Sequence, residues 1–452
     1  MFQYLRERLT LVLLALLPLH ALLVTVGTKL LMGKGHAPLA VLALWKEALL
    51  GIILLLVVIE WVKAQPRRLR WDVIDGLIVA LIILSVFVTV LTHGDLKLAL
   101  LGFKYDFVPL VTFLFVRRVT WSEAFQKMAM QVLLGVSAII ALYGILTVFL
   151  PMKFFLWLGY SPAHSLYFAD GPLAAFQQVS ETALRRVQST MSGPNQFGLW
   201  LLVPFSVLLM TVASRKAITL AQAVMGAFIL VALFLTFSRA AWIAASVMTI
   251  TALCRSVPRP LLKRVIVGAV FTCVTVGVIA TLLFPSIFFR LSSSRGHLVR
   301  PLQAMGRMIH SPLGEGLGAA GPASNRVSET CVFLRPQDDP SWAKTTPMLC
   351  VFLGTTQVQP VDHVCRCPFL PENWYLQIGV ELGMLGFILF VALTIMLLLS
   401  LTRATISSPV FILFLGISIA ALVLHAWEDS AVAYTVWLLL GTRLSSPRSL
   451  AG

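Results

Sequence analysis

The sequence predicts an all-α, polytopic membrane protein with about 12 transmembrane helices and a large extracytoplasmic loop between helices 9 and 10. Three observations predict this fold class. Hydrophobic residues make up 58% of the 452 residues and charged residues only 12%, which leaves too little polar surface to cover a soluble globule. The apolar residues form runs of spanning length. The basic residues gather in the short connections between those runs.

The apolar runs define the individual spans. A membrane core of about 30 Å needs roughly 20 apolar residues per helix, and twelve segments meet this requirement, although the eighth and twelfth are short. They are residues 9–32, 39–62, 73–92, 98–116, 126–150, 194–213, 217–237, 240–254, 265–288, 372–400, 409–426 and 431–442. No small-residue cleavage site follows the first run, so we expect it to be retained as a span.

The basic residues predict the orientation of the chain. If the N-terminus is cytoplasmic, most Lys and Arg residues fall in inner connections, and the short outer ones keep only Lys34, Lys97 and a few others. The positive-inside rule therefore places both termini in the cytoplasm. It also explains the net charge of +16, and no basic patch interleaved with aromatic residues indicates nucleic acid as a partner.

Two outer segments are long, residues 151–193 and 289–371, and only the second is large enough for a subdomain. We therefore expect three regions along the chain. Residues 1–288 hold helices 1–9, residues 289–371 form the extracytoplasmic loop subdomain, and residues 372–452 hold helices 10–12.

Polar side chains gather at the predicted outer ends of the spans, and the inner halves carry almost nothing comparable. These groups are Lys46, Glu47, Lys104, Asp106, Asn195, Gln196, Arg239, Glu428 and Asp429. Polar groups inside a bilayer are costly unless they are paired or line a wet cavity. They are either structural ion pairs between helices or the lining of a cavity open to the outside, and their one-sidedness favours the cavity.

The tenth span carries two patterned faces. Asn373, Gln377 and Glu381 recur at four-residue spacing and predict a polar stripe that lines the cavity. Three glycines form a second face, on which we expect the backbone of another helix to pack closely. They are Gly379, Gly383 and Gly386.

The outer loop is predicted to begin with a basic amphipathic helix. Pro301 suits its first turn, and Leu302, Met305 and Ile309 recur on one side. The cationic or titratable groups are Arg295, His297, Arg300 and Arg307. They predict either a collar that binds lipid headgroups or a pocket for a phosphate or pyrophosphate, which the forked donors of arginine fit well.

The rest of the loop contains a glycine motif and four cysteines. "GLGAAG", residues 316–321, matches GxGxxG but follows a helix-like stretch, so we expect it to shape a turn or approach an anion, not to bind a dinucleotide. Four extracytoplasmic thiols predict two disulfides with three possible connectivities, of which Cys365–Cys367 is the least favourable sterically. The four are Cys331, Cys350, Cys365 and Cys367. A zinc site that uses them or His363 is an alternative, but paired CxxC spacing is missing.

Five stretches in order resemble the O-antigen ligase and polymerase superfamily over roughly residues 180–400. They are "SGPNQFGLW", "LTFSRAAW", "SSSRGHL", "HSPLGEGLGAAGP" and "ENWYLQIGVELGMLGF". The resemblance implies a metal-independent glycosyltransferase without a cofactor, in the bacterial cytoplasmic (inner) membrane with a periplasmic active face. Such enzymes move a glycan from undecaprenyl diphosphate to an acceptor hydroxyl. Ligases use lipid A-core, polymerases use another lipid-linked repeat, and a related branch uses protein Ser or Thr.

The resemblance also implies roles for single residues. Arg239 matches an arginine that contacts the diphosphate, and either Arg295 or Arg300 matches the arginine that opens the loop helix. Ligases usually have a histidine directly before the asparagine of "NxYLQ", where it activates the acceptor, but this chain has Glu372 there. A carboxylate can serve as the general base. Alternatively Glu372 pairs with a loop arginine, and the base is His297 or His363.

We therefore expect an inverting transferase of the O-antigen ligase type, with a polymerase or a protein O-oligosaccharyltransferase as alternatives. Arg239 and a loop arginine stabilise the leaving diphosphate, and Glu372 or His297 deprotonates the acceptor. The remaining substrate-binding candidates are Asn195, Gln196, Lys104, Asn373 and Gln377. A transporter of lipid-linked glycans is the rival class. It predicts polar groups at full depth, interrupted helices and an internal repeat, none of which we find in the sequence.

Overall fold

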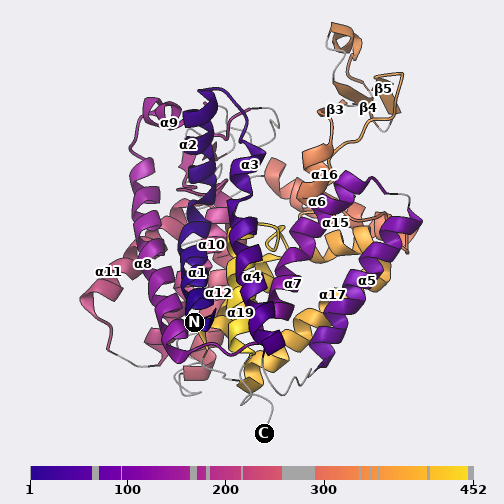
Figure 1. Ribbon diagram of the computed structural model, residues 1–452. Helices are drawn as coiled ribbons and strands as arrows, with labels where there is room; N and C mark the ends of the chain where they lie inside the picture. Colours follow the sequence, from indigo (N-terminus) through magenta and orange to yellow (C-terminus); the bar gives the residue numbers. More distant parts are fainter. Residues whose placement is uncertain are drawn as a thin grey trace. The chain divides into compact units, whose positions relative to one another are not determined.

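The structure is a computed structural model that describes most of the chain (Figure 1). The described residues are 2–63, 71–92, 94–162, 171–179, 184–214, 217–256, 291–334, 337–345, 349–354, 356–404 and 408–445. Over these ranges the chain is mainly helical, with a few short strands. The predicted ninth span, 265–288, lies outside the described residues.

Six helical stretches among the described residues are long and apolar enough to cross a membrane, or seven if the bent pair α6 (Leu96–Asp106) and α7 (Val108–Val116) counts as one span. The first combines α1 (Phe2–Leu16), η1 (Leu17–Leu19) and α2 (His20–Met32). The second combines α3 (Ala40–Ala43) and α4 (Trp45–Lys63). The others are α5 (Val73–Leu91), α8 (Glu123–Thr147), α10 (Pro194–Ala213) and α17 (Trp374–Ala404). This architecture fits the predicted α-helical membrane protein, and the count of twelve spans stays a prediction.

The chain folds into two compact units that are interleaved along the sequence. Unit 1 contains Met1–Asp75, Pro109–Gly296 and Thr394–Gly452, and unit 2 contains Gly76–Val108 and His297–Leu393. Each unit therefore combines segments that are distant in the sequence.

Unit 1 is a helical bundle centred on α10. This helix contacts α8, α11 (Leu220–Leu235), α12 (Arg239–Ser256), α18 (Pro409–Ala420) and α19 (Ser430–Arg443), and Figure 1 shows it among its labelled neighbours. Its side chains are apolar on most faces, with Trp200 and Phe197 fully buried, as expected for a central helix. A two-stranded ribbon of β1 (Gln177–Gln178) and β2 (Arg185–Arg186) follows the short helix α9 (Met152–Leu158).

Ion pairs also lie at helix ends that the positive-inside rule assigns to the cytoplasm. Arg6 Nε is 3.1 Å from Glu60 Oε2, and Arg117 bridges the carboxylates of Asp72 and Asp75 at 2.6 and 3.0 Å. The prediction that these inner ends carry nothing comparable to the outer polar groups is therefore wrong. At the other end of α4, Lys46 and Glu47 form an ion pair at 3.2 Å. For these two residues the contact supports a structural ion pair over the lining of a cavity.

Unit 2 contains a small disulfide-linked sheet. Its strands are ordered β3 (Cys331–Leu334), β4 (Cys350–Leu353) and β5 (Thr356–Gln359), with β3 parallel and β5 antiparallel to β4. A 3₁₀ turn, η2 (Ser341–Thr345), lies between β3 and β4 in the sequence. The disulfides are Cys331–Cys367 and Cys350–Cys365. Glu329, His363 and Cys365 lie within reach of one metal ion, but the sulfur of Cys365 is held in the disulfide and is not a thiolate ligand.

The long helix α17 is interrupted at Gly383, which has a φ of 73°. The segment after α15 (Leu291–His310) fills this break. The N–H groups of Glu315 and Gly316 donate to the carbonyls of Val380 and Glu381 at 2.9 and 3.0 Å, and Met384 N–H donates to Pro312 O at 3.1 Å. These bonds satisfy backbone groups that a broken span would otherwise leave unpaired in an apolar region.

Three sequence-based predictions about this region need correction. Gly383 contacts the loop at Pro312 and not another helix, because it adopts a left-handed conformation that ends the first half of α17. The expectation of uninterrupted helices is wrong for the same reason. Pro301 lies inside α15 and not in its first turn, since the helix already begins at Leu291.

The GxGxxG stretch shapes a turn. Gly316, Gly318 and Gly321 all have positive φ, at 99°, 81° and 72°. The turn leads into α16 (Gly321–Val327), and a Cβ atom on Gly102 of α6 would lie 2.6 Å from Gly318 N, so the two backbones touch. The glycines therefore allow close backbone contact within unit 2.

Candidate functional site

Three predicted site residues meet in unit 2 at the start of α17. Glu372 Oε1 accepts a hydrogen bond from Arg300 Nη1 at 2.6 Å, and Glu372 Oε2 lies 3.6 Å from His297 Nδ1. The carboxylate is 15% exposed, whereas the imidazole is 35% and the guanidinium side chain 43% exposed. A carboxylate, an imidazole and a guanidinium therefore lie together, each of them partly exposed.

Two local features position this cluster. His297 and Arg300 are three residues apart on α15, a spacing that brings side chains to neighbouring positions on a helix. Glu372 has a φ of 56°, an uncommon value for a residue with a side chain. The next residue, Asn373, accepts the N–H of Leu376 at 3.0 Å and so caps the first turn of α17. The turn at Glu372 thus points the chain into the helix while the carboxylate faces α15.

The arrangement has clear chemical consequences. The Arg300 guanidinium donates to Glu372 Oε1 at 2.6 Å, so that oxygen is already engaged in an ion pair. A carboxylate beside one nitrogen of an imidazole orients the ring and stabilises the imidazolium that forms when the other nitrogen takes a proton. The geometry therefore favours His297 as the proton acceptor and Glu372 as its partner.

His363 occupies a different environment in the disulfide-linked part of unit 2. Its Nδ1 lies 3.0 Å from Asp362 Oδ1 and its Nε2 lies 2.7 Å from Glu329 Oε1. The hydrogen bonds to Glu329 and then to Asp362 raise the pKa of His363. Both ring nitrogens of His363 already face carboxylates and neither is open to an acceptor hydroxyl, so this candidate is the least supported.

A second polar cluster lies in unit 1 around Arg186. Its guanidinium donates to Asn195 Oδ1 at 2.8 Å, to Gln177 Oε1 at 3.2 Å and to the carbonyls of Thr236 and Phe237 at 2.9 and 3.4 Å. One side chain thus joins the β1–β2 ribbon, the first turn of α10 and the connection between α11 and α12.

The connection held by Arg186 leads directly into Arg239, the first residue of α12. Phe237 has a φ of 49°, and Ser238 N–H donates to Thr236 Oγ1 at 3.2 Å. Val187 N–H also donates to Leu235 O at 3.0 Å. The turn before Arg239 is therefore held from several sides, and the Arg186 guanidinium makes two of these bonds.

Sequence reasoning missed Arg186. It is one of two consecutive arginines in an outer segment, and nothing in the sequence distinguishes it from other basic loop residues. Its position nine residues before Asn195 is the one signal, since an arginine near the start of a span can reach back to the polar residues that open it.

The remaining candidates are distributed over both units. Asn195 and Gln196 lie in the first turn of α10, and Arg239 opens α12, all in unit 1. Lys104 lies in the last turn of α6 and Gln377 is 1% exposed on α17, both in unit 2. Arg295 belongs to α15, but its side chain lies outside the described part of the structure, so Arg300 is the loop arginine whose contacts are known.

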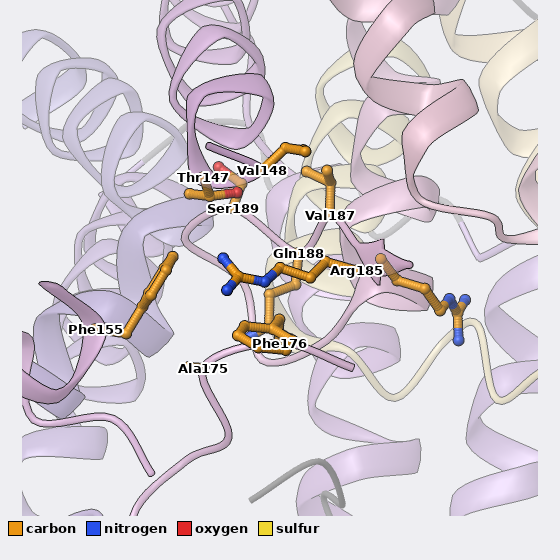
Figure 2. Close-up of a pocket in the computed structure, with 10 residues that line it drawn as sticks. Thr147, Val148, Phe155, Ala175, Phe176, Arg185, Val187, Gln188 and Ser189 are labelled. Atoms are coloured by element: carbon orange, nitrogen blue, oxygen red, sulfur yellow. The ribbon is translucent and has the colours of Figure 1, made fainter. Parts of the chain in front are cut away.

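A small pocket lies beside the Arg186 cluster in unit 1 (Figure 2). It is lined by residues of α8, α9 and the loop that carries the β1–β2 ribbon. Figure 2 shows Arg185 extending over the ring of Phe176, to which its guanidinium carbon is 4.3 Å distant. Arg185 also donates to Leu150 O at 2.7 Å. The two adjacent arginines therefore have separate structural surroundings.

Fold and composition together define the class of this protein as α-helical and multi-pass. Comparisons with known protein families and with curated proteins find no match to the chain. Any closer assignment therefore depends on the residues themselves.

Proposed function

We propose that the protein is a metal-independent, inverting glycosyltransferase of the O-antigen ligase type, which uses no cofactor. It moves a glycan from undecaprenyl diphosphate to a hydroxyl of lipid A-core at the outer face of the bacterial cytoplasmic membrane. The observation that carries the proposal is the cluster of His297, Arg300 and Glu372 at the start of a candidate membrane span. It combines a group that can take a proton with a cation that can bind a phosphate.

The reaction needs few groups. The acceptor oxygen attacks the anomeric carbon of the glycan, its proton passes to the base, and the bond from that carbon to the diphosphate oxygen breaks. The electron pair leaves with undecaprenyl diphosphate, whose charge the Arg300 guanidinium can stabilise. Arg239 is the other arginine that the family resemblance assigns to the diphosphate. His297 takes the proton, and Glu372 orients the imidazole. Asn195, Gln196, Lys104, Asn373 and Gln377 are the candidates for holding the two substrates.

The direct test is transfer by the purified protein in detergent, with lipid-linked glycan and lipid A-core supplied. A transferase forms the conjugate without a sealed compartment. Arg239→Ala should abolish transfer while expression and thermal stability stay near those of the unchanged protein. Full transfer by that variant would remove Arg239 from the mechanism.

Other acceptors define the nearest alternatives. A polysaccharide polymerase would lengthen a second lipid-linked repeat, and a protein O-oligosaccharyltransferase would modify Ser or Thr. Mass analysis of the glycoconjugates lost when the protein is removed separates these outcomes, because each enzyme leaves a different product missing.

A transporter of lipid-linked glycans is supported by one specific observation, the break in α17 at Gly383. Interrupted helices are common where transporters hold their substrates. The loop bonds across this break favour a fixed structural joint over a moving one. The detergent assay decides between the classes, since a transporter yields no covalent product.

A further inference from the structure

Helix α15 carries an apolar stripe that no described part of the protein covers. Leu298, Leu302, Met305 and Ile309 are 69%, 65%, 43% and 64% exposed. At about 100° per residue these four positions fall within an arc of about 60°. Four large apolar side chains thus form one continuous surface along three turns of the helix.

The other faces of α15 are different in character. Ala304 and Met308 are buried against Leu376 and Val380 of α17. Between Leu298 and His310 the polar residues lie at least about 120° around the helix from Leu298; they are Arg300, Gln303, Arg307 and His310. His297 and Arg295, which precede the stripe, lie about 100° and about 60° from Leu298. The helix contains no acidic residue between Leu291 and His310. From Leu298 to His310 the helix is therefore cationic on one side, apolar on the opposite side and packed against α17 between the two.

Helix α15 packs on the first two turns of α17. α17 is a candidate membrane span that begins at Trp374, and Leu376 and Val380 lie within its first two turns. At 1.5 Å per residue, these contacts lie within about 9 Å of the end of the span. Further along α17, Leu385 and Ile388 are also exposed, at 54% and 53%.

We propose that α15 lies in the plane of the membrane surface at the start of α17. Its apolar stripe lies among the lipid acyl chains, and its cationic side faces the headgroups and water. An interfacial helix of this kind buries its apolar face about 5–10 Å into the boundary and binds anionic lipids through its basic residues. The partner is the lipid surface itself. The packing of α15 on a candidate membrane span and the absence of acidic residues both favour lipid over a second copy of the chain.

This position has a consequence for the site. An interfacial α15 holds His297 and Arg300 at the depth of the headgroups, which is where the diphosphate of a lipid-linked donor lies. That consequence rests on the proposed function, whereas the position of the helix does not.

The test is a depth measurement on single-cysteine variants in nanodiscs that contain anionic lipid. Cys254 is an exposed free thiol, so the background is Cys254→Ser with Cys273→Ser. Leu302→Cys and Gln303→Cys, one residue apart and on different sides of α15, are labelled with a fluorescent probe. Leu385→Cys on α17 is the positive control for lipid contact.

Lipids with a quencher near the start of the acyl chain should quench the probe at residue 302 several-fold more than the probe at residue 303, and a water-soluble quencher should give the reverse order. Equal quenching at the two positions by both reagents would overturn the proposal. Oxidative cross-linking of two copies through residue 302 would also overturn it and assign the stripe to a dimer. Because no readout depends on transfer, the result stands apart from the proposed activity.

Discussion

At the scale of single residues, the pairing of His297 with Glu372 and Arg300 predicts how the general-base role is divided. His297→Ala should lower turnover by about 10²–10⁴-fold, the usual contribution of a general base. Glu372→Gln should lower it less, because the imidazole remains. His310→Ala, on the exposed side of the same helix, is the matched control and should transfer normally. Transfer assays with saturating substrates measure all three.

A larger loss of turnover in Glu372→Gln than in His297→Ala would make Glu372 the base. If Glu372→Gln is inactive and His297→Ala turns over normally, then the carboxylate itself takes the proton. Full activity in both variants would remove the whole cluster from the chemistry.

Arg186 gives a second prediction at this scale, as a positioning residue for Arg239. Arg186→Gln removes the guanidinium that joins Asn195 to the carbonyls of Thr236 and Phe237. We expect a loss of about 1–3 kcal/mol in unfolding free energy, since buried acceptors lose their donor. We also expect faster amide hydrogen exchange in the turn 234–239 and a raised donor KM.

Arg185→Gln is the control for this substitution. It removes the same charge from the neighbouring position, where the side chain donates to Leu150 O and covers Phe176. Exchange in the turn 234–239 should stay unchanged in this variant. Equal acceleration in the two variants would show that loss of charge, and not the Arg186 bonds, loosens the turn.

At the scale of structural elements, the break in α17 predicts that Gly383 does not tolerate a side chain. A Cβ atom there would meet Pro312 O, and the φ of 73° is itself costly for other residues. Gly383→Ala should therefore lower the unfolding free energy by more than about 1 kcal/mol. Gly135→Ala in α8, which has open space at its Cβ, should be neutral or stabilising by up to about 1 kcal/mol. Thermal unfolding in detergent compares them, and equal stability of both variants would argue for a continuous helix.

The sheet of unit 2 has a predictable pH response. The pKa of His363 is raised by Glu329 and Asp362, so its contribution to stability is present at low pH and is lost as pH rises through that raised value. The pKa of Glu329 is lowered by the Arg366 N–H and by His363, so its contribution is lost as pH falls through the lowered value. Local stability should therefore be greatest between the two values.

Hydrogen exchange at Arg366, whose N–H donates to Glu329 Oε2 at 2.8 Å, reports this response. After correction for the intrinsic pH dependence of exchange, protection should peak in the weakly acidic range. Glu329→Gln should flatten the profile on both sides. An unchanged profile in that variant would mean that the pair has no part in local stability.

At the scale of the whole molecule, the sequence predicted the features that depend on periodicity and composition. The predicted spans at 73–92, 194–213 and 372–400 correspond closely to α5, α10 and α17, because long apolar runs have few alternatives to a helix. Two disulfides were also expected, but their connectivity depends on chain folding and could not be read from spacing.

Other features depend on contacts that the sequence does not encode locally. In a sequence, a glycine inside a helix cannot be distinguished from a glycine with positive φ at a helix break. Gly383 was therefore interpreted as part of a helix-packing face. The sequence gives no reason to prefer Arg186 over Arg185 as a site residue, because the hydrogen-bond partners of Arg186 lie 9 to 51 residues away. The alternative that Glu372 pairs with a loop arginine is confirmed by Arg300, whereas its role as the base stays a prediction. Its contact with His297 could not be predicted, because it depends on the packing of α15 on α17.

The central claim is that this membrane protein transfers a glycan from a lipid diphosphate. The most direct measurement is product formation by the purified chain in detergent, with undecaprenyl-diphosphate-linked glycan and lipid A-core, compared between the unchanged protein and Arg239→Ala. We expect a glycan–lipid A-core conjugate and released undecaprenyl diphosphate with the unchanged protein, and neither product with Arg239→Ala. Absence of any covalent product from the folded, unchanged protein across lipid, glycan and protein acceptors would contradict it.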